Sequence, residues 1–169
     1  MRRLVFALAL ACAPPAAAQA PAEDIARVSR LLAANWRPLG PDAASAPRAA
    51  FAAACAGAVE EMETLDAALP AELTPEALAP IRPPTGFIIV ATDQPERIFL
   101  FPNPALNWIA SGEAVITAAD AASGIVRLRD AAEREAELQL GISGAQAMLR
   151  LTAPGGALRL YVGCAPTAR

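Results

Sequence analysis

The chain has 169 residues, of which 55% are hydrophobic and 18% charged, and its formal net charge is −3. All 14 basic residues are arginine, and histidine is absent, which excludes histidine-dependent nucleophiles, imidazole metal sites and lysine Schiff bases. The length is that of one domain, and the acidic balance argues against nucleic acid as a partner.

The N-terminus has the three parts of a secretory signal peptide. Arg2 and Arg3 form a positive n-region, an apolar run covers 4–11, and small residues follow as far as Ala18. The run is too short to cross a bilayer, which takes about 20 residues. We expect 1–18 to be a signal peptide, and the mature chain to be periplasmic or secreted, with no membrane span.

A lipid anchor is the alternative at this end of the chain. The sequence around Cys12 resembles a degraded lipoprotein box, although leucine stands two residues before the cysteine instead of three. The simpler interpretation is a cysteine inside a cleaved signal peptide. Both interpretations export the chain across the inner membrane of a bacterium.

Two cysteines remain after cleavage, Cys55 and Cys164. An even number of cysteines in an oxidising compartment indicates a disulfide. The alternative is two free buried thiols, which a periplasm with dedicated oxidases disfavours. We therefore expect one bridge between Cys55 and Cys164.

The N-terminal part, 19–84, has helical periodicity. One apolar helical face is formed by Ile25, Val28, Leu31, Leu32 and Trp36, and Pro38 is expected to end this helix. A second helix has a narrow apolar seam of Phe51, Cys55, Ala58, Met62, Leu65 and Leu69. The seam directs Cys55 toward whatever the helix packs on. Glu60, Glu61 and Glu63 lie off the seam and are interpreted as a solvated face.

The C-terminal part, 85–169, has the alternation of hairpin strands. Strands are expected at 87–92, 98–101 and 108–117, and then around 126–128, 136–142, 147–151 and 158–164. One face is apolar and the other polar, which is typical of an antiparallel sheet covered on one side. The predicted fold class is α+β, with N-terminal helices packed on one face of a roughly six-stranded antiparallel β-meander. Residues 19–169 are expected to form one domain.

Charge and turn residues predict the register of the last hairpins. Placing Val126 opposite Leu138 sets Arg127 against Glu137, which is a favourable cross-strand pair. Turns are expected at 144–145 and 154–155. The last turn would place Arg150 beside Arg159 and Met148 beside Tyr161.

Motifs for catalysis, cofactors or metals are not found, so no catalytic, cofactor-binding or metal-binding residue is predicted. The loop acids Asp93, Glu96, Glu113 and Asp120 could support acid–base chemistry only if the fold brought two of them together. We interpret them as solvated turn residues.

Two surfaces are candidates for binding. The first is Met148, Arg150, Arg159 and Tyr161, because tyrosine and arginine are favoured at interfaces; the alternative is an ordinary solvated sheet face. The second is a groove lined by Trp36 and Trp108 beside prolines 102 and 104 and Asn103, the alternative being tryptophans that fill the edge of a core.

The resulting hypothesis is an exported, non-enzymatic binding or interaction module of the bacterial cell envelope, whose partner is an envelope protein or a small ligand. One alternative is a carboxylate-dependent hydrolase of an envelope polymer, which a deep pocket holding two carboxylates would favour. Another is a lipoprotein accessory subunit lipidated at Cys12. An apolar patch away from the core would favour the binding module.

The export prediction is tested by the intact mass of protein recovered from the periplasm. We expect a chain that begins at Gln19, because cleavage after Ala18 satisfies the small-residue rule. A diacylglycerol-bearing chain that begins at Cys12 would favour the lipoprotein alternative instead. Recovery of the full-length chain from the cytoplasm would contradict both.

Overall fold

The computed structural model describes residues 22–40, 43, 47–68, 74, 83–103, 106, 112–143, 145–152 and 156–166. The expected signal peptide and Cys12 lie outside the described residues. The elements in chain order are α1 (Ala22–Leu32), β1 (Ala34–Pro38), α2 (Pro47–Ala54), α3 (Ala58–Ala68), β2 (Phe87–Ala91), β3 (Arg97–Pro102), β4 (Gly112–Asp120), β5 (Ile125–Asp130), β6 (Glu135–Ser143), β7 (Gln146–Thr152) and β8 (Leu158–Pro166).

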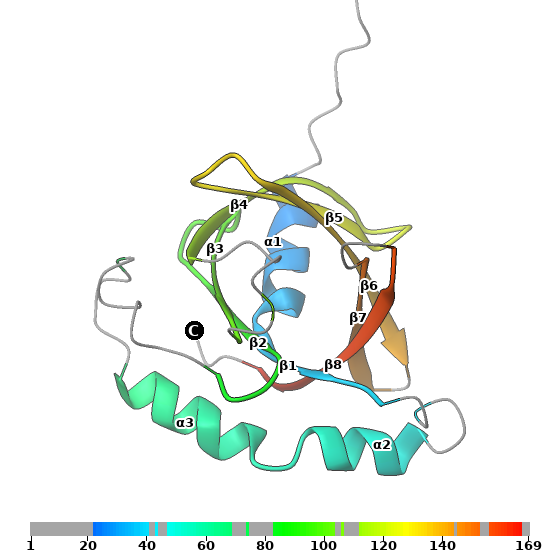
Figure 1. The fold of residues 1–169 in the computed structure, drawn as a ribbon. Coiled ribbons are helices and arrows are strands. Elements are labelled where there is room, and N and C mark those ends of the chain that lie inside the picture. The colour runs from blue at the N-terminus through cyan, green and yellow to red at the C-terminus, as the bar shows by residue number, and fades with distance from the viewer. Residues whose placement is uncertain are drawn as a thin grey trace, which may run out of the picture.

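The eight strands form a closed antiparallel barrel, in which each strand pairs with its neighbours in sequence and β8 returns to pair with β1 (Figure 1). The predicted α+β meander with helices on one face was therefore wrong. The apolar faces of a closed sheet cover one another across the barrel, so the sheet does not depend on a helical layer to cover it.

The strand that closes the barrel, β1, was missed because its sequence continues the spacing of the preceding helix. Trp36 lies in phase with Val28 and Leu32, and the helix was expected to run on to Pro38. The structure instead ends α1 at Leu32 and begins β1 at Ala34. β1 pairs with β2 on one side and β8 on the other, which removes both sheet edges.

Large side chains fill the barrel interior. Trp36 stacks on Phe87 with ring centroids 6.3 Å apart, and Phe87 meets Tyr161 edge-on at 5.0 Å. Gly163 pairs with Trp36, and a Cβ at Gly163 would come within 3.3 Å of the indole ring. Since an eight-stranded barrel is just wide enough for side chains, these residues occupy its centre.

Helix α1 lies within the ring of strands when the barrel is viewed along its axis (Figure 1). Its Val28 and Leu32 belong to the same buried cluster as the interior strand residues. The indole Nε1 of Trp36 donates a hydrogen bond to the carbonyl of Leu32 at 2.7 Å. Thus α1 and β1 are joined by packing as well as by the chain.

The predicted second helix is two helices, α2 and α3, which run along the outside of the barrel. Gly57 separates them with a φ of 75°, a left-handed conformation that glycine adopts without strain. The predicted seam is confirmed at Met62 and Leu65, which are buried against the outer face of β2 and β3. The partners there are Ile88, Val90, Phe99 and Phe101.

The prediction that Glu61 lies on a solvated face was wrong. Its Oε2 accepts a hydrogen bond of 2.7 Å from Asn35 Nδ2 and forms an ion pair with Arg37. Arg37 also donates to Thr85. Asn35 and Arg37 are buried residues of β1 that point outward, so α3 supplies a carboxylate where β1 presents a cation and an amide.

The predicted register of β5 and β6 is confirmed. Val126 lies opposite Leu138 and Arg127 opposite Glu137, where an ion pair of 3.2 Å forms. Arg129 lies opposite Glu135 as expected, but its guanidinium contacts Glu133 at 3.3 Å. Gly124, in the preceding turn, has a φ of 71°.

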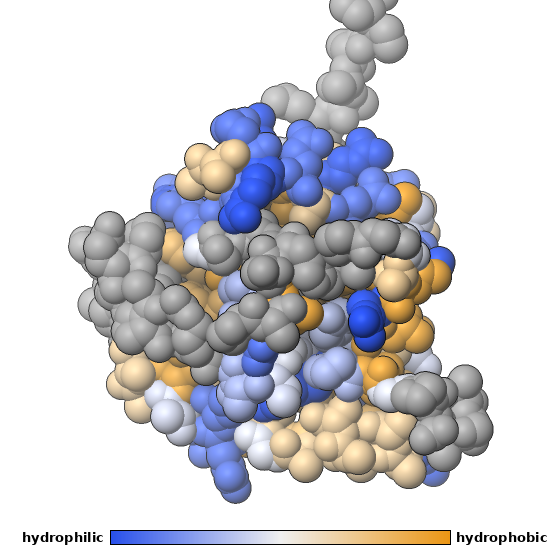
Figure 2. Space-filling model, viewed as in Figure 1, coloured by the Kyte–Doolittle hydropathy of each residue, from blue (hydrophilic) through white to orange (hydrophobic). Residues whose placement is uncertain are grey.

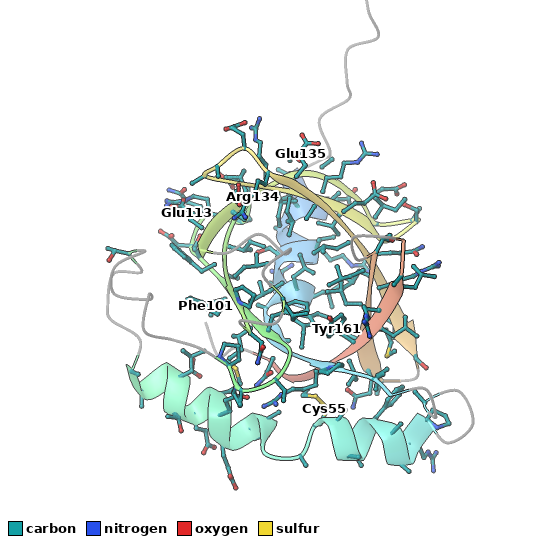
Figure 3. The ribbon with its side chains drawn as sticks, in the orientation of Figure 1. Cys55, Phe101, Glu113, Arg134, Glu135 and Tyr161 are labelled. Atoms are coloured by element: carbon teal, nitrogen blue, oxygen red, sulfur yellow. A yellow bond between two sulfur atoms is a disulfide. The ribbon has the colours of Figure 1, made fainter. Side chains whose placement is uncertain are left out.

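The disulfide between Cys55 and Cys164 is confirmed, with the two Cα atoms 5.2 Å apart. It joins the turn after α2 to the outer face of β8, and Figure 3 shows Cys55 between the helices and the barrel. The bridge closes a loop with a sequence separation of 109 residues, so it restricts the unfolded chain strongly.

We expect Cys55→Ser and Cys164→Ser each to lower the free energy of unfolding by about 2–5 kcal/mol. The reason is the loss of the constraint on the unfolded chain, and urea denaturation of the oxidised proteins measures it. Reduction of the wild type should give a similar loss. Two free thiols in the purified periplasmic protein would contradict the bridge.

Candidate functional site

The four residues of the first predicted surface do not share one face. Met148 and Arg150 point outward from β7, whereas Tyr161 is 2% exposed and belongs to the interior cluster. Figure 3 shows Tyr161 directed into the ring of strands. Arg159 is exposed and pairs with Leu151. The four residues therefore do not form the single patch that was expected.

The cause is a one-residue difference in the register of β7 and β8. The expected turn would pair Met148 with Tyr161, but the structure pairs Met148 with Val162 and Arg150 with Leu160. A one-residue shift reverses the face of every side chain in a strand. The aromatic cluster explains which face of β8 points inward. Tyr161 packs inside the barrel against Phe87, and Gly163 leaves room there for Trp36.

This register exposes leucines on the outside of the barrel. Leu158 is 53% exposed and Leu160 is 46% exposed, although both lie in a regular strand. We define the β7–β8 wall as Met148, Arg150, Leu158 and Leu160. Figure 2 shows hydrophobic residues at the right of the molecule, on the side where Figure 1 places β7 and β8.

The outer faces of the neighbouring strands β5 and β6 are polar, in contrast to the β7–β8 wall. The outer face of β5 and β6 carries Arg127, Arg129, Glu135, Glu137 and Gln139, all of them exposed. This is the polar exterior that a solvated antiparallel sheet normally has. The leucines of the β7–β8 wall therefore depart from the pattern of the same barrel.

A cleft of about 560 Å³ lies beside this wall, between α2 and the β6–β7 hairpin. We call it the α2 cleft; it is lined by Pro47, Arg48, Phe51, Ala52, Cys55, Ser143, Ala145 and Gln146. Gln146 is the next outward residue after Met148 on β7, and the disulfide joins Cys55 to β8. The cleft and the wall are therefore parts of one continuous outer surface.

A smaller cleft of about 290 Å³ lies where α1 meets the β4–β5 turn and the end of β6. Its lining includes Arg27, Leu31, Leu140 and the exposed Ile142. Like the α2 cleft, its described lining contains one arginine and no acidic residue.

Two of the four acids that were interpreted as turn residues, Glu113 and Asp120, lie in β4, and Asp120 contacts Ser123 at the edge of the smaller cleft. Glu113 accepts a hydrogen bond of 2.6 Å from Arg97 Nε. Asp120 accepts one of 2.7 Å from the Ser123 hydroxyl, and this bond and the Ala122 N–H hold the pKa of its carboxyl below the usual value. Asp93 and Glu96 lie in the turn between β2 and β3. Neither cleft is lined by any of them.

The second predicted surface is only partly described. Trp36 is fully buried in the barrel, which agrees with the alternative that it fills a core. Asn103 donates a hydrogen bond to the carbonyl of Pro84 at 2.5 Å, and Pro102 ends β3. Trp108 and Pro104 lie outside the described residues.

The polar cluster of Asn35, Arg37, Glu61 and Thr85 was not foreseen from the sequence. It holds buried atoms for which the described residues provide no hydrogen-bond partner, namely Asn35 Oδ1, Arg37 Nε and Glu61 Oε1. The alternation of polar Asn35 and Arg37 with apolar Ala34 and Trp36 was the sequence signal for an outward-facing polar pair on a strand. This signal was not used because the segment was assigned to the first helix.

Among the residues that the structure describes, no cluster of three or more acidic or cysteine side chains could hold a metal ion. No described helix is long and apolar enough to cross a membrane. Comparisons with protein-family models, curated proteins and solved structures gave no significant match.

Asp130, the last residue of β5, is a buried acid that accepts three hydrogen bonds. Burial raises the pKa of its carboxyl, but hydrogen bonds from the Arg134 and Ala132 N–H groups and from the Arg134 guanidinium outweigh this effect. The net result is a pKa below the usual value of 3.8. The folded state therefore favours the ionised form.

We expect Asp130→Asn to lower the free energy of unfolding by about 1–3 kcal/mol at neutral pH, because a buried charge-assisted contact to Arg134 is lost. A lowered folded-state pKa stabilises the protein above the unfolded pKa, and this stabilisation disappears as pH falls through the folded value. The difference between wild type and variant should thus shrink below about pH 4. Urea denaturation across pH measures it.

The control for this series is Asp93→Asn, which changes an exposed turn residue. Its unfolding free energy should stay close to that of the wild type. A difference for Asp130→Asn that is the same at every pH would show that the ionised carboxylate is not the cause.

Proposed function

We propose that this protein is an exported, non-enzymatic binding module of the bacterial cell envelope, and that it binds its partner through the β7–β8 wall. The observation that carries this proposal is the pair of exposed leucines, Leu158 and Leu160, on the solvent face of a regular strand. Exposed apolar groups that gather on one face of a folded domain are typical of interaction sites.

The filled interior supports a site on the outside. Trp36, Phe87, Leu128, Leu138 and Leu149 are all buried within the barrel. A ligand would have to displace these side chains to enter, whereas the β7–β8 wall is already accessible. The wall is also rigid, since it belongs to a closed barrel and is adjacent to the disulfide. Rigid surfaces lose less conformational entropy when they bind.

The electrostatic environment of the clefts favours binding over acid–base chemistry. A carboxylate-dependent hydrolase needs two acids in one cavity, but the described lining of both clefts supplies arginine and no acid. The lipoprotein alternative depends on Cys12, and so on the sequence alone.

Site-specific photo-crosslinking in the native bacterium tests this proposal. We expect a benzophenone amino acid at position 160 to form a discrete adduct with one envelope component, because this side chain faces outward among apolar neighbours. The matched control carries the same group at position 137, an exposed position on the charged β5–β6 face. It should form no such adduct.

A second variant links the adduct to the apolar surface. Leu158→Glu should abolish the adduct formed from position 160 while the protein keeps its circular dichroism spectrum and its disulfide. Equal adducts at 160 and 137, or an adduct that survives Leu158→Glu, would refute a binding role for the wall.

A further inference from the structure

The α2 cleft and the wall beside it carry arginines that have no carboxylate partner in the described part of the chain. Five other arginines form ion pairs: Arg37 with Glu61, Arg97 with Glu113, Arg127 with Glu137, Arg129 with Glu133 and Arg134 with Asp130. Arg27 and Arg30 of α1 and Arg159 of β8 form no ion pair with the described residues. Arg48 in the cleft and Arg150 on the adjoining wall have no ion pair within the described residues. The outer surface that joins them is therefore locally cationic on a chain of net charge −3.

The cleft is also apolar and concave. Pro47, Phe51 and Ala52 of α2 form one side, and the β6–β7 hairpin forms the other. α2 has no buried residue, so its alanines and Phe51 remain available to a partner. A volume of about 560 Å³ lies within the range of cavities that take small ligands and short side-chain groups.

The shape distinguishes a polypeptide segment from a lipid surface. A cleft between a helix and a hairpin admits side chains of an extended chain, whereas a bilayer surface is flat on this scale. The net negative charge of the protein also opposes approach to an anionic membrane. The cations at the cleft and on the wall complement carboxylates placed along such a segment.

We propose that the α2 cleft binds an extended segment of a partner polypeptide in which acidic residues alternate with or adjoin apolar ones. A carboxylate of the segment pairs with Arg48, an apolar side chain contacts Phe51, and the segment continues over Leu160 toward Arg150. This inference rests on the proposed function, since the β7–β8 wall continues the same surface. The disulfide joins Cys55, at the α2 side of the cleft, to β8, the strand that pairs with β7.

Selection from a random peptide library displayed on phage tests the chemistry of the partner. The oxidised mature protein should enrich peptides rich in Asp or Glu together with aliphatic or aromatic residues. Arg48→Glu should lose this preference, because attraction is replaced by repulsion. Arg30→Glu makes the same charge change on an exposed residue of α1 and should keep the preference.

Titration of one selected peptide gives the quantitative result. We expect Arg48→Glu to weaken its binding about tenfold, which corresponds to about 1.4 kcal/mol. A peptide with its acidic residues replaced by lysine should bind Arg48→Glu better than it binds the wild type. Chemical-shift changes should centre on Phe51 and Gln146.

Several outcomes would overturn the inference. These are enrichment without acidic residues, equal affinity of both charge forms of the peptide for wild type and Arg48→Glu, or shifts confined to another face. Binding of laurate or of anionic vesicles with the same dependence on Arg48, in the absence of peptide binding, would assign the cleft to a lipid instead. If the adduct at position 160 forms while these tests fail, only the cleft inference falls and the proposed function stands.

Discussion

Closure of the barrel by β1 is the constraint on which the rest of the structure depends. This short strand pairs with both β2 and β8, and its Trp36 fills the centre of the barrel against Phe87 and Gly163. The same strand presents Asn35 and Arg37 outward, where Glu61 of α3 meets them. One five-residue strand thus fixes the interior packing, removes the sheet edges and positions the outer helices.

The interior packing in turn decides which residues face solvent on β8. Because Tyr161 and Gly163 must lie inside, Leu158, Leu160 and Val162 point outward. Val162 is buried near the helices and Cys164 is bridged to Cys55, while Leu158 and Leu160 remain exposed. The outward orientation of these leucines is therefore a consequence of the interior packing. They are exposed because no described element of the chain covers them.

The sequence predicted local pairing better than it predicted closure. The β5–β6 register followed from alternation and opposite charges at Arg127 and Glu137, which are both local signals. The disulfide followed from the cysteine count and the phase of Cys55. Closure depends on a contact between β1 and β8 far apart in the chain, for which Trp36 gave no strand signal. The predicted register of β8 was wrong, because alternation identifies the two faces of a strand without showing which face lies inside.

The same physical reasons explain why the candidate surface was predicted only in part. Met148 and Arg150 were placed on one outward face from β7 alone, and the structure keeps them there. Tyr161 was grouped with them by a turn assumption, whereas its aromatic ring belongs with Phe87. Because Leu160 faces outward where Tyr161 was expected, the surface is an aliphatic patch, which runs into the α2 cleft, and not an aromatic one. The partner proposed above would meet this surface with apolar groups at the leucines and with carboxylates at Arg48 and Arg150.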